Sequence, residues 1–349
     1  MIWNKLSVYI EGIIRGREKS AVFVLLSPFL FILSVVYAFG VWIHQGLYRT
    51  GVLKRFRAPV PVVSVGNIMA GGTGKTPFVI VIYQELVARG FHPCILTRGY
   101  KGGDEALMLT EILGPVVFSG VDRVASFRTA EQMGVFDSVI LDDGFQHWRF
   151  ERDCDIVLLD AEDPFGNKGL LPLGALREPL TALQRADVIL LTRTDRVLPG
   201  RVERLLEQMR GAVPKAVLGC SVFSARVVTD IFSGNVIPFA AVPGAAGCLC
   251  AIGSPDNFRR TIEPLGIIPV IFAVFTDHHN FTQDDIASFV RACRSKKLEK
   301  IFMTHKDAVK MRGYRELFTG LQVMRIDIET KVVYGKNEFV SVLDRLHHS

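Results

Sequence analysis

The chain has 349 residues, of which 49% are hydrophobic and 22% are charged, and its formal net charge at pH 7 is +6. This length suits one large domain or two smaller ones, and the apolar content excludes a chain that is disordered throughout. The mild excess of positive charge fits anionic partners such as nucleotides, phospholipids or nucleic acids, and it does not choose among them.

An uncharged segment near the N-terminus is the first expected element. Residues 21–43 contain no charged side chain, and about 20 apolar residues are enough to cross a bilayer core as a helix. Apolar residues at helical spacing precede it between positions 3 and 14, and basic residues follow it up to position 57. An internal proline and glycine weaken a straight span, so a helix that lies in one leaflet is an alternative to a full crossing. A buried core helix is a third alternative. We predict a membrane-associated N-terminal helical segment over residues 1–57.

Short apolar and β-branched runs alternate with helical stretches over residues 58–214. The expected strands are PVVSVGN, PCILTRG, PVVFSG, DSVILDDG, CDIVLLD and ADVILLTRTD, with helices over 77–89, 122–133 and 201–210. Continuous apolar strands separated by helices are typical of a parallel sheet whose two faces are both covered. This pattern predicts an α/β core.

A second, smaller set of elements follows over residues 215–349. Its expected strands are KAVLGCSVF, GCLCAIG, VIFAVF, KIFMT and QVMRIDI, and the stretch PGAAG at 243–247 is typical of a loop. Thr282, followed three positions later by Asp285, predicts a capping box at a helix N-terminus. We therefore predict a smaller C-terminal α/β lobe.

The stretch GNIMAGGTGKTPF, residues 66–78, lies where the first strand of the core gives way to a helix. Such a loop points backbone N–H groups and the positive end of the helix dipole at an anion. Lys75 is placed to reach the β- and γ-phosphates of a nucleotide, and Thr76 is placed to bind Mg²⁺. We therefore predict a P-loop NTPase-like core, with a mostly parallel sheet and helices on both faces. The predicted nucleotide-binding residues are Gly71, Gly72, Thr73, Gly74, Lys75 and Thr76.

Other classes of phosphate-loop protein are alternatives, and the loop departs from each of their patterns. Met69 stands where the full G-x-x-x-x-G-K-[ST] pattern has its first glycine. Ala70 stands where partition-type ATPases carry a lysine, and TRTD at 192–195 lacks the asparagine of the guanine-reading N-K-x-D motif. The competing function is a membrane-associated nucleotide switch, either an ATPase or a GTPase.

An acidic stretch, SVILDDGFQHWR, runs from residue 138 to residue 149. An apolar strand that ends in Asp142 and Asp143 puts carboxylates at the carboxyl edge of the sheet, beside the phosphate loop, where a nucleotide-bound Mg²⁺ needs them. Two adjacent carboxylates repel each other, so a metal ion or Lys75 is expected beside them. We assign Asp142, with Thr76, to the metal, although the sequence alone does not distinguish it from its neighbour.

A set of segments occurs in a fixed order along the chain: VGNIMAGGTGKTP, LTRGYKG, GDEALML, LDDGFQH, PFGNKGLLPLGALREP, AIGSPDNF, TDHHNFT and KDAVK. Together they resemble the tetraacyldisaccharide 4′-kinase family, the lipid A 4′-kinases of Gram-negative bacteria, over most of the chain. The resemblance implies an enzyme that uses ATP and Mg²⁺ to phosphorylate the 4′-hydroxyl of a tetraacylated glucosamine disaccharide 1-phosphate. It also implies a location on the cytoplasmic face of the inner membrane.

The resemblance assigns roles to further residues. Asp104, in GDEA, matches the family's catalytic aspartate, and His278, in TDHH, matches the histidine that pairs with it. A carboxylate held by an imidazole can take the proton that a hydroxyl loses during phosphoryl transfer. Lys75 is the third predicted catalytic residue. The predicted substrate-binding residues are Asp143, Gln146, His147, Arg177 and Glu178.

The lipid substrate gives the apolar N-terminal segment a function. Each buried CH₂ contributes roughly 0.8 kcal/mol, so a lipid with four acyl chains stays in the bilayer and the enzyme must reach it there. Each basic residue of the stretch 49–57 is expected to add about 1 kcal/mol of attraction to anionic lipid. The expected partners are therefore the tetraacyldisaccharide 1-phosphate and the membrane, with no nucleic acid and no protein partner that can be inferred.

Overall fold

The computed structural model describes residues 12, 21–99, 103–134 and 136–346. The apolar residues expected to form a helix between positions 3 and 14 lie outside these described residues. The chain divides into two compact units that interleave along the sequence. Unit 1 comprises residues 1–98, 115–222 and 330–349, and unit 2 comprises residues 99–114 and 223–329. The division into 1–57, 58–214 and 215–349 follows sequence order and stays a prediction.

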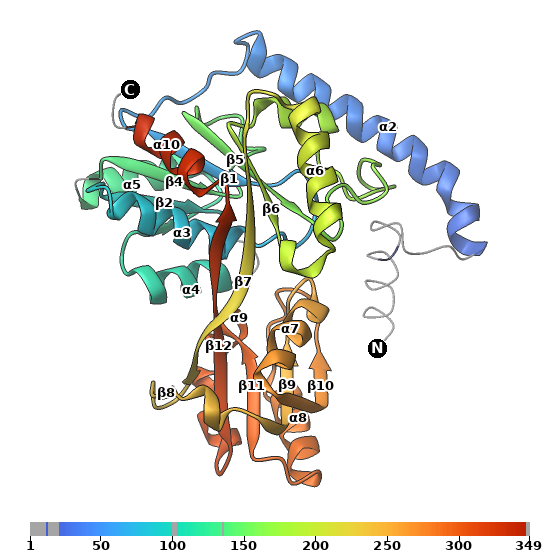
Figure 1. The fold of residues 1–349 in the computed structure, drawn as a ribbon, viewed down its shortest axis with the longest axis vertical. Helices are drawn as coiled ribbons and strands as arrows, with labels where there is room; N and C mark the ends of the chain where they lie inside the picture. The colour runs from blue at the N-terminus through green and yellow to red at the C-terminus, as the bar shows by residue number, and fades with distance from the viewer. Residues whose placement is uncertain (1–11, 13–20, 100–102, 135, 347–349) are drawn as a thin grey trace. The chain divides into compact units, whose positions relative to one another are not determined.

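Unit 1 is built on a parallel sheet with the strand order β6-β5-β1-β4-β2-β3 (Figure 1). Its strands are β1 (Val62–Gly66), β2 (Pro93–Thr97), β3 (Val117–Ser119), β4 (Ser138–Asp142), β5 (Cys154–Asp160) and β6 (Val188–Thr192), and the first residues of β7 (Val217–Asp230) pair with β6. Every residue of β1, β2, β4 and β6 is buried. Burial on both faces explains why these strands read as continuous apolar runs rather than alternating ones.

Helices complete unit 1. After β1 they are α3 (Lys75–Val87), α5 (Arg123–Met133), α6 (Pro199–Ala212) and α10 (Lys336–Arg345), with short 3₁₀ turns at Leu180–Arg185 and Thr194–Arg196. The apolar side chains of α5 join a core with β2 and β4, while those of α6 join a separate core with β5 and β6. The side chain of Asp122 caps α5 by accepting from two backbone N–H groups of its first turn.

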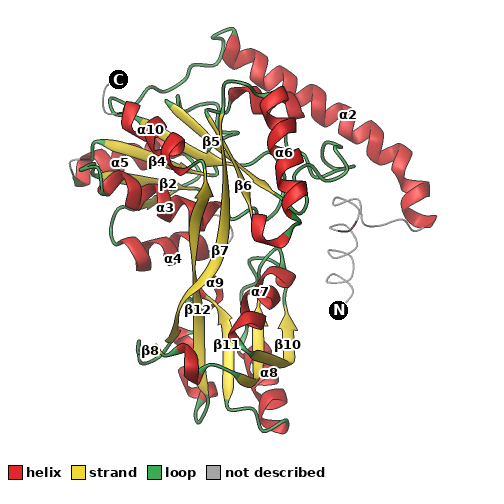
Figure 2. Ribbon diagram, viewed as in Figure 1, coloured by secondary structure: helices red, strands yellow, loops and turns green. Residues whose placement is uncertain are grey.

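In unit 2, parallel strands follow the order β10-β9-β11-β12 (Figure 1), and Figure 2 draws the strands in yellow. The elements are α4 (Asp104–Leu113), β8 (Val236–Ile237), β9 (Gly244–Cys250), α7 (Pro255–Ile262), β10 (Ile267–Val274), α8 (Gln283–Ser295), β11 (Lys300–Thr304), α9 (His305–Ala308), a 3₁₀ segment at Arg312–Phe318 and β12 (Gln322–Tyr334). The capping box predicted from Thr282 and Asp285 is confirmed at the N-terminus of α8. The predicted fold class, a mostly parallel α/β sheet with P-loop topology and a second α/β part, is confirmed.

The prediction of a loop at PGAAG was wrong. Strand β9 begins at Gly244, which pairs with Ile267 of β10. The small residues reflect close packing, because a Cβ atom on Gly247 would lie 2.4 Å from Cys293 Sγ and 3.2 Å from the ring of Phe289, both on α8. Glycine is needed here so that the helix can approach the strand, and it does not mark a turn.

The long helix α2 (Ala21–Arg49) belongs to unit 1 and is largely exposed (Figure 1). Its stretch Phe23–Arg49 is long and apolar enough to cross a membrane, with a mean hydropathy of 2.3, and only 6% of its most apolar window is buried. One stripe of the helix contacts the rest of the unit: Ser34 Oγ donates to the carbonyl of Leu170 at 2.9 Å, and Tyr37 donates to that of Arg177 at 2.9 Å. The alternative of a buried core helix does not fit this exposure.

We expect Gly247→Ala to lower the stability of unit 2 by about 1–3 kcal/mol, because the added methyl group overpacks the contact between β9 and α8. Adding Cys293→Ala to this variant removes the clashing sulfur atom and should recover part of the loss. Thermal unfolding in detergent measures both effects. Gly313→Ala, where a new Cβ meets nothing within 4 Å, is the matched control, and an equal loss in that control would contradict the packing argument.

Candidate active site

The phosphate loop of unit 1 joins the carboxyl end of β1 to the N-terminus of α3. Gly71 and Gly74 have φ angles of 123° and 88°, in a region that glycine reaches without a Cβ clash. Helix α3 begins at Lys75, and no side chain caps its N-terminus. Uncapped backbone N–H groups at a helix N-terminus form an anion-binding site, so the loop has the form that a nucleotide phosphate requires.

Side chains from neighbouring segments brace this loop. Asn67 Nδ2 donates to Thr73 Oγ1 at 3.0 Å, and Gln146 Nε2 donates to the carbonyl of Asn67 at 2.7 Å. From the end of β6, Arg193 Nη2 donates to the carbonyl of Gly72 at 2.8 Å. Arg193 belongs to the TRTD stretch that the GTPase alternative would assign to guanine recognition, and here it supports the phosphate loop instead. A preorganised loop pays less conformational entropy when it binds a nucleotide.

The turn after β4 packs directly against the start of the phosphate loop. Strands β1 and β4 are neighbours, with Val65 opposite Asp142. Asp142 is 3% exposed, and its Oδ2 accepts from Thr97 Oγ1 at 3.1 Å. Gly66 cannot be another residue without movement of the turn, because a Cβ there would lie 2.5 Å from Phe145 Cβ.

Asp143 lies between two cations. Lys75 Nζ is 3.5 Å from Asp143 Oδ1, and Arg177 Nη1 is 2.9 Å from each of its two oxygens. Arg177 Nη1 is also 3.3 Å from Gln146 Oε1. Burial raises the pKa of the Asp143 carboxyl, but the charges of Lys75 and Arg177 outweigh burial and lower that pKa. The structure therefore brings four of the predicted site residues together: Lys75, Asp143, Gln146 and Arg177.

The other two predicted substrate residues, Glu178 and His147, have different neighbours. Glu178 is 2% exposed, and its carboxylate accepts from Arg185 at 2.6 Å and from Trp148 Nε1 at 3.4 Å. Burial and the charges of Arg123 and other nearby arginines lower the pKa of His147 to about 4, so its imidazole is neutral at pH 7. The roles of both residues toward a substrate stay predictions.

Unit 2 holds the predicted carboxylate–imidazole pair. Asp104 is the first residue of α4 and is 1% exposed. Its Oδ1 and Oδ2 lie 2.9 and 3.1 Å from His278 Nδ1, although the two residues are 174 positions apart. His278 has a φ angle of 60°, which is uncommon outside glycine, and its N–H donates to the carbonyl of Ala251 at 3.3 Å. A strained loop is thus held where it meets the helix N-terminus.

Two lysine side chains place positive charge beside the Asp104 carboxylate. Burial raises its pKa, but the hydrogen bond with His278 and the charges of Lys306 and Lys310 outweigh burial and lower the pKa to about 2. Asp104 is therefore ionised at every physiological pH. Lys310 Nζ is 2.9 Å and Lys306 Nζ is 3.9 Å from Asp104 Oδ2.

The residues of unit 1 fit a Mg²⁺ ion beside nucleotide phosphates. Mg²⁺ takes oxygen ligands, usually one or two from protein and the rest from phosphates and water. Thr76, in the first turn of α3, can supply a hydroxyl, and Asp142, at the end of the strand next to β1, can supply a carboxylate. Within the described ranges no group of three or more His, Cys, Asp and Glu could hold a metal ion.

The parallel α/β sheet with a phosphate loop after β1 defines the chain as a phosphate-loop nucleotide-binding protein. A family model described as tetraacyldisaccharide-1-P 4′-kinase matches residues 26–348. The chain therefore belongs to the tetraacyldisaccharide-1-P 4′-kinase family. The predictions of this family, of an ATP-binding kinase and of the P-loop fold class are confirmed.

Similar proteins support the same assignment. A tetraacyldisaccharide 4′-kinase of Syntrophus aciditrophicus is 34% identical, with 87% of this chain and 90% of that protein covered. A probable mitochondrial tetraacyldisaccharide 4′-kinase of Arabidopsis thaliana is 37% identical, with 81% and 80% covered. The crystal structure of LpxK from Aquifex aeolicus in complex with ATP matches with a TM-score of 0.70 and 26% identity, covering 93% of this chain and 99% of that one.

Lys306 and Lys310 are the residues near Asp104 that the sequence prediction did not include. Both lie in KDAVK, one of the segments on which the family resemblance was based. Their spacing of four positions, which puts two side chains on one side of a helical turn, was the available signal. Nothing in the sequence alone connected that turn to Asp104, which lies about 200 positions earlier in the chain.

We expect Asp104→Asn to destabilise unit 2 at pH 7 by up to about 2 kcal/mol. The folded-state pKa of Asp104 is lowered, so its stabilising contribution is present above the unfolded value of about 3.9 and is lost as pH falls toward 2. The difference between the variant and the native protein should therefore shrink below pH 4. Urea unfolding from pH 2 to pH 7 measures it. Asp284→Asn, at an exposed carboxylate of the same unit, is the control, and a difference that grew toward low pH would contradict the assigned charge state.

Proposed function

We propose that this kinase transfers the γ-phosphoryl group of ATP to the 4′-hydroxyl of a tetraacylated glucosamine disaccharide 1-phosphate. The observation that carries the proposal is the buried Asp104–His278 pair. A nucleotide switch needs a phosphate loop and a positioned water, whereas an alcohol acceptor needs a base for its hydroxyl proton. A carboxylate that is buried, ionised and held by an imidazole suits that task.

On the nucleotide side, the backbone N–H groups of residues 71–76 hold the phosphates and Lys75 contacts the transferring group. Thr76 and Asp142 would hold Mg²⁺, which would neutralise phosphate charge when bound. Asp143 has a positioning role, because its carboxylate fixes the ammonium of Lys75 and the guanidinium of Arg177. Nucleotide phosphates that enter this site meet a lysine whose direction is already set.

On the acceptor side, the 4′-oxygen attacks the γ-phosphorus and a new P–O bond forms. The bond from the γ-phosphorus to the bridging oxygen breaks, and ADP leaves with that oxygen. The hydroxyl proton passes to the carboxylate of Asp104. His278 donates its Nδ1–H to the Asp104 carboxylate and holds it in position.

Arg177 is the candidate for an anionic group of the substrate, since a guanidinium binds phosphate in two-point contacts. Gln146 accepts from it and donates to the loop, and His147 follows in the same turn. Glu178 acts indirectly: its carboxylate accepts from the indole of Trp148 and the guanidinium of Arg185 and holds both in position. We place Asp143, Gln146, His147, Arg177 and Glu178 on the substrate side of the site.

The same proposal places the protein on the cytoplasmic face of the inner membrane through α2. Exposed apolar side chains cover the helix outside its contact stripe, among them Leu25 at 81%, Val36 at 63% and Trp42 at 67% exposure. Such a surface is unusual on a soluble protein and is typical of a lipid contact. ATP is a cytosolic compound, so the phosphate loop must face the cytosol.

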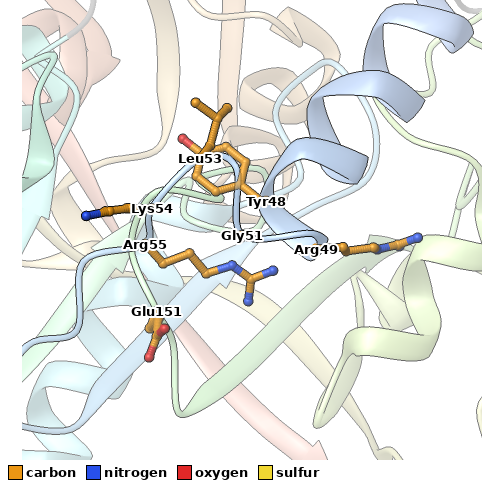
Figure 3. A pocket seen from close by; sticks show the side chains of 7 residues that line it. All are labelled: Tyr48, Arg49, Gly51, Leu53, Lys54, Arg55 and Glu151. Carbon is orange, nitrogen blue, oxygen red and sulfur yellow. The ribbon is translucent and has the colours of Figure 1, made fainter.

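A basic pocket follows the end of α2 directly (Figure 3). It is lined by Tyr48, Arg49, Gly51, Leu53, Lys54, Arg55 and Glu151. The guanidinium groups of Arg49 and Arg55 lie 5.7 and 5.4 Å from the ring centre of Trp148. Cations beside an aromatic ring at the end of an apolar helix are typical of the level of lipid headgroups.

The reaction is tested with γ-labelled ATP, Mg²⁺ and a tetraacyldisaccharide 1-phosphate in mixed micelles. Label in the lipid with the native protein supports the proposal. Asp104→Asn should lower kcat by roughly 10²–10⁴-fold, because general-base assistance is lost, while ATP affinity stays within about twofold. Lys75→Ala should lower kcat and should also weaken ATP binding. Free labelled phosphate without labelled lipid would favour the nucleotide switch instead.

We expect the triple variant Arg49→Gln, Lys54→Gln, Arg55→Gln to bind anionic vesicles roughly 100-fold more weakly, at about 1 kcal/mol per charge. Binding to neutral vesicles should stay the same, because α2 is intact. Flotation with phosphatidylglycerol-containing and pure phosphatidylcholine vesicles measures both. The control removes three exposed charges elsewhere, at Arg204, Lys215 and Arg226. Equal losses in the two variants would mean that only net charge matters.

A further inference from the structure

Two lysines of the KDAVK segment contact the Asp104–His278 pair from α9 and the turn after it. We propose that Lys310 and Lys306 are positioning residues for this pair, with Lys310 holding the carboxylate and Lys306 holding the imidazole. The inference rests on the proposed role of Asp104 as proton acceptor. All four residues belong to unit 2.

Lys310 ties the start of α4 to the loop that carries His278. Its Nζ lies 2.9 Å from Asp104 Oδ2 and donates to the carbonyl of His279 at 3.0 Å. The same atom lies 5.7 Å from the ring centre of Phe281, and the side chain is 12% exposed. An ammonium group with these neighbours is held in place, so the Asp104 oxygen that it binds is held in place too.

Lys306 determines which nitrogen of His278 carries the proton. Its Nζ donates to Asp277 Oδ1 at 3.0 Å and lies 3.3 Å from His278 Nε2. An ammonium group can only donate, so Nε2 acts as the acceptor in this contact. The imidazole proton therefore resides on Nδ1, where it is donated to Asp104. Lys306 thus selects the tautomer that the carboxylate needs.

A buried carboxylate holds this lysine turn against the strand that also supports His278. Asp307 is fully buried and accepts from Thr304 Oγ1 at 2.6 Å and from the N–H of Ala251 at 3.2 Å. The carbonyl of Ala251 accepts from the N–H of His278 at 3.3 Å. The turn that carries the lysines and the loop that carries His278 are therefore both bound to the backbone of Ala251, directly after the end of β9.

The charges around the pair are nearly balanced. Asp104, Glu105 and Asp277 face Lys306 and Lys310, with Lys306 Nζ 3.6 Å from Glu105 Oε1. Burial lowers the pKa of Lys306, but Glu105, Asp277 and Asp104 outweigh burial and raise it. At the far end of α4, Glu111 meets His305, Arg312 and Arg325. Lys306 therefore stays charged over the range in which the enzyme can be assayed.

This arrangement makes Asp104 well placed but weakly basic. Phosphoryl transfer has little covalent chemistry for the protein to perform, and the hydroxyl proton becomes acidic only as the new P–O bond forms. Placement of the carboxylate therefore matters more than its basicity in the free enzyme. Removal of the lysines should raise the pKa of Asp104, since burial would then dominate, and should still slow the reaction.

The test compares Lys306→Met, Lys310→Met and their double variant with the control Lys296→Met, at an exposed lysine of the same unit. Each single variant should lower kcat by roughly 10–100-fold and leave the KM for ATP within about twofold. Arginine at either position should restore part of kcat. The native enzyme should have a flat kcat/KM between pH 5 and 7, whereas the double variant should show an acid limb in this range. Activities equal to that of Lys296→Met would overturn the proposal.

A second measurement does not depend on catalysis. In thermal unfolding at pH 7, the losses in Tm from Asp104→Asn and Lys310→Met should not add in the double variant, because the two residues share one contact. Additive losses, or lost activity without an acid limb and without rescue by arginine, would overturn the positioning role. If the native protein labels no lipid, the proposed reaction fails, while non-additive Tm losses still support the contact.

Discussion

The parallel pairing of β1 with β4 is the constraint on which the nucleotide site depends. It places Val65, next to the start of the phosphate loop, opposite Asp142. The chain can turn directly after β4 only because Gly66 leaves room for Phe145. Asp143 then meets Lys75 and Arg177 within one turn. A shift of this register by one residue would turn every strand side chain to the opposite face and separate the carboxylates from the loop.

Both units keep a carboxylate ionised by the same physical means. Asp143 in unit 1 and Asp104 in unit 2 are each desolvated, which opposes ionisation, and each is surrounded by cations that reverse the effect. An unpaired charge at the buried Asp104 would destabilise the fold by several kcal/mol, so its cations are needed even without substrate. The same contacts fix the direction of the side chains, and stability and preorganisation therefore have one source.

Local rules and long-range contacts were predictable to different degrees. The strand-end rule was enough to expect Asp142 and Asp143 beside the phosphate loop, because parallel strands bring their carboxyl ends to one edge. The pairing of Asp104 with His278 came only from the family resemblance, since no periodicity links residues 174 positions apart. The PGAAG stretch was misread because glycine serves both turns and close helix–strand packing. Glu178 showed no sequence sign of its burial beside Trp148.

The attachment of α2 connects the proposed membrane contact to the substrate side of the site. Tyr37 of the helix binds the backbone carbonyl of Arg177, and Ser34 both donates to the carbonyl of Leu170 and accepts from the N–H of Leu173. The segment that ends at Arg177 is therefore anchored on the helix, and Arg177 in turn holds Asp143. A helix that enters a bilayer would set the depth of this guanidinium at the interface. The phosphate of a lipid headgroup lies at that same level, so one helix would position both the enzyme and the residue that we propose binds the lipid.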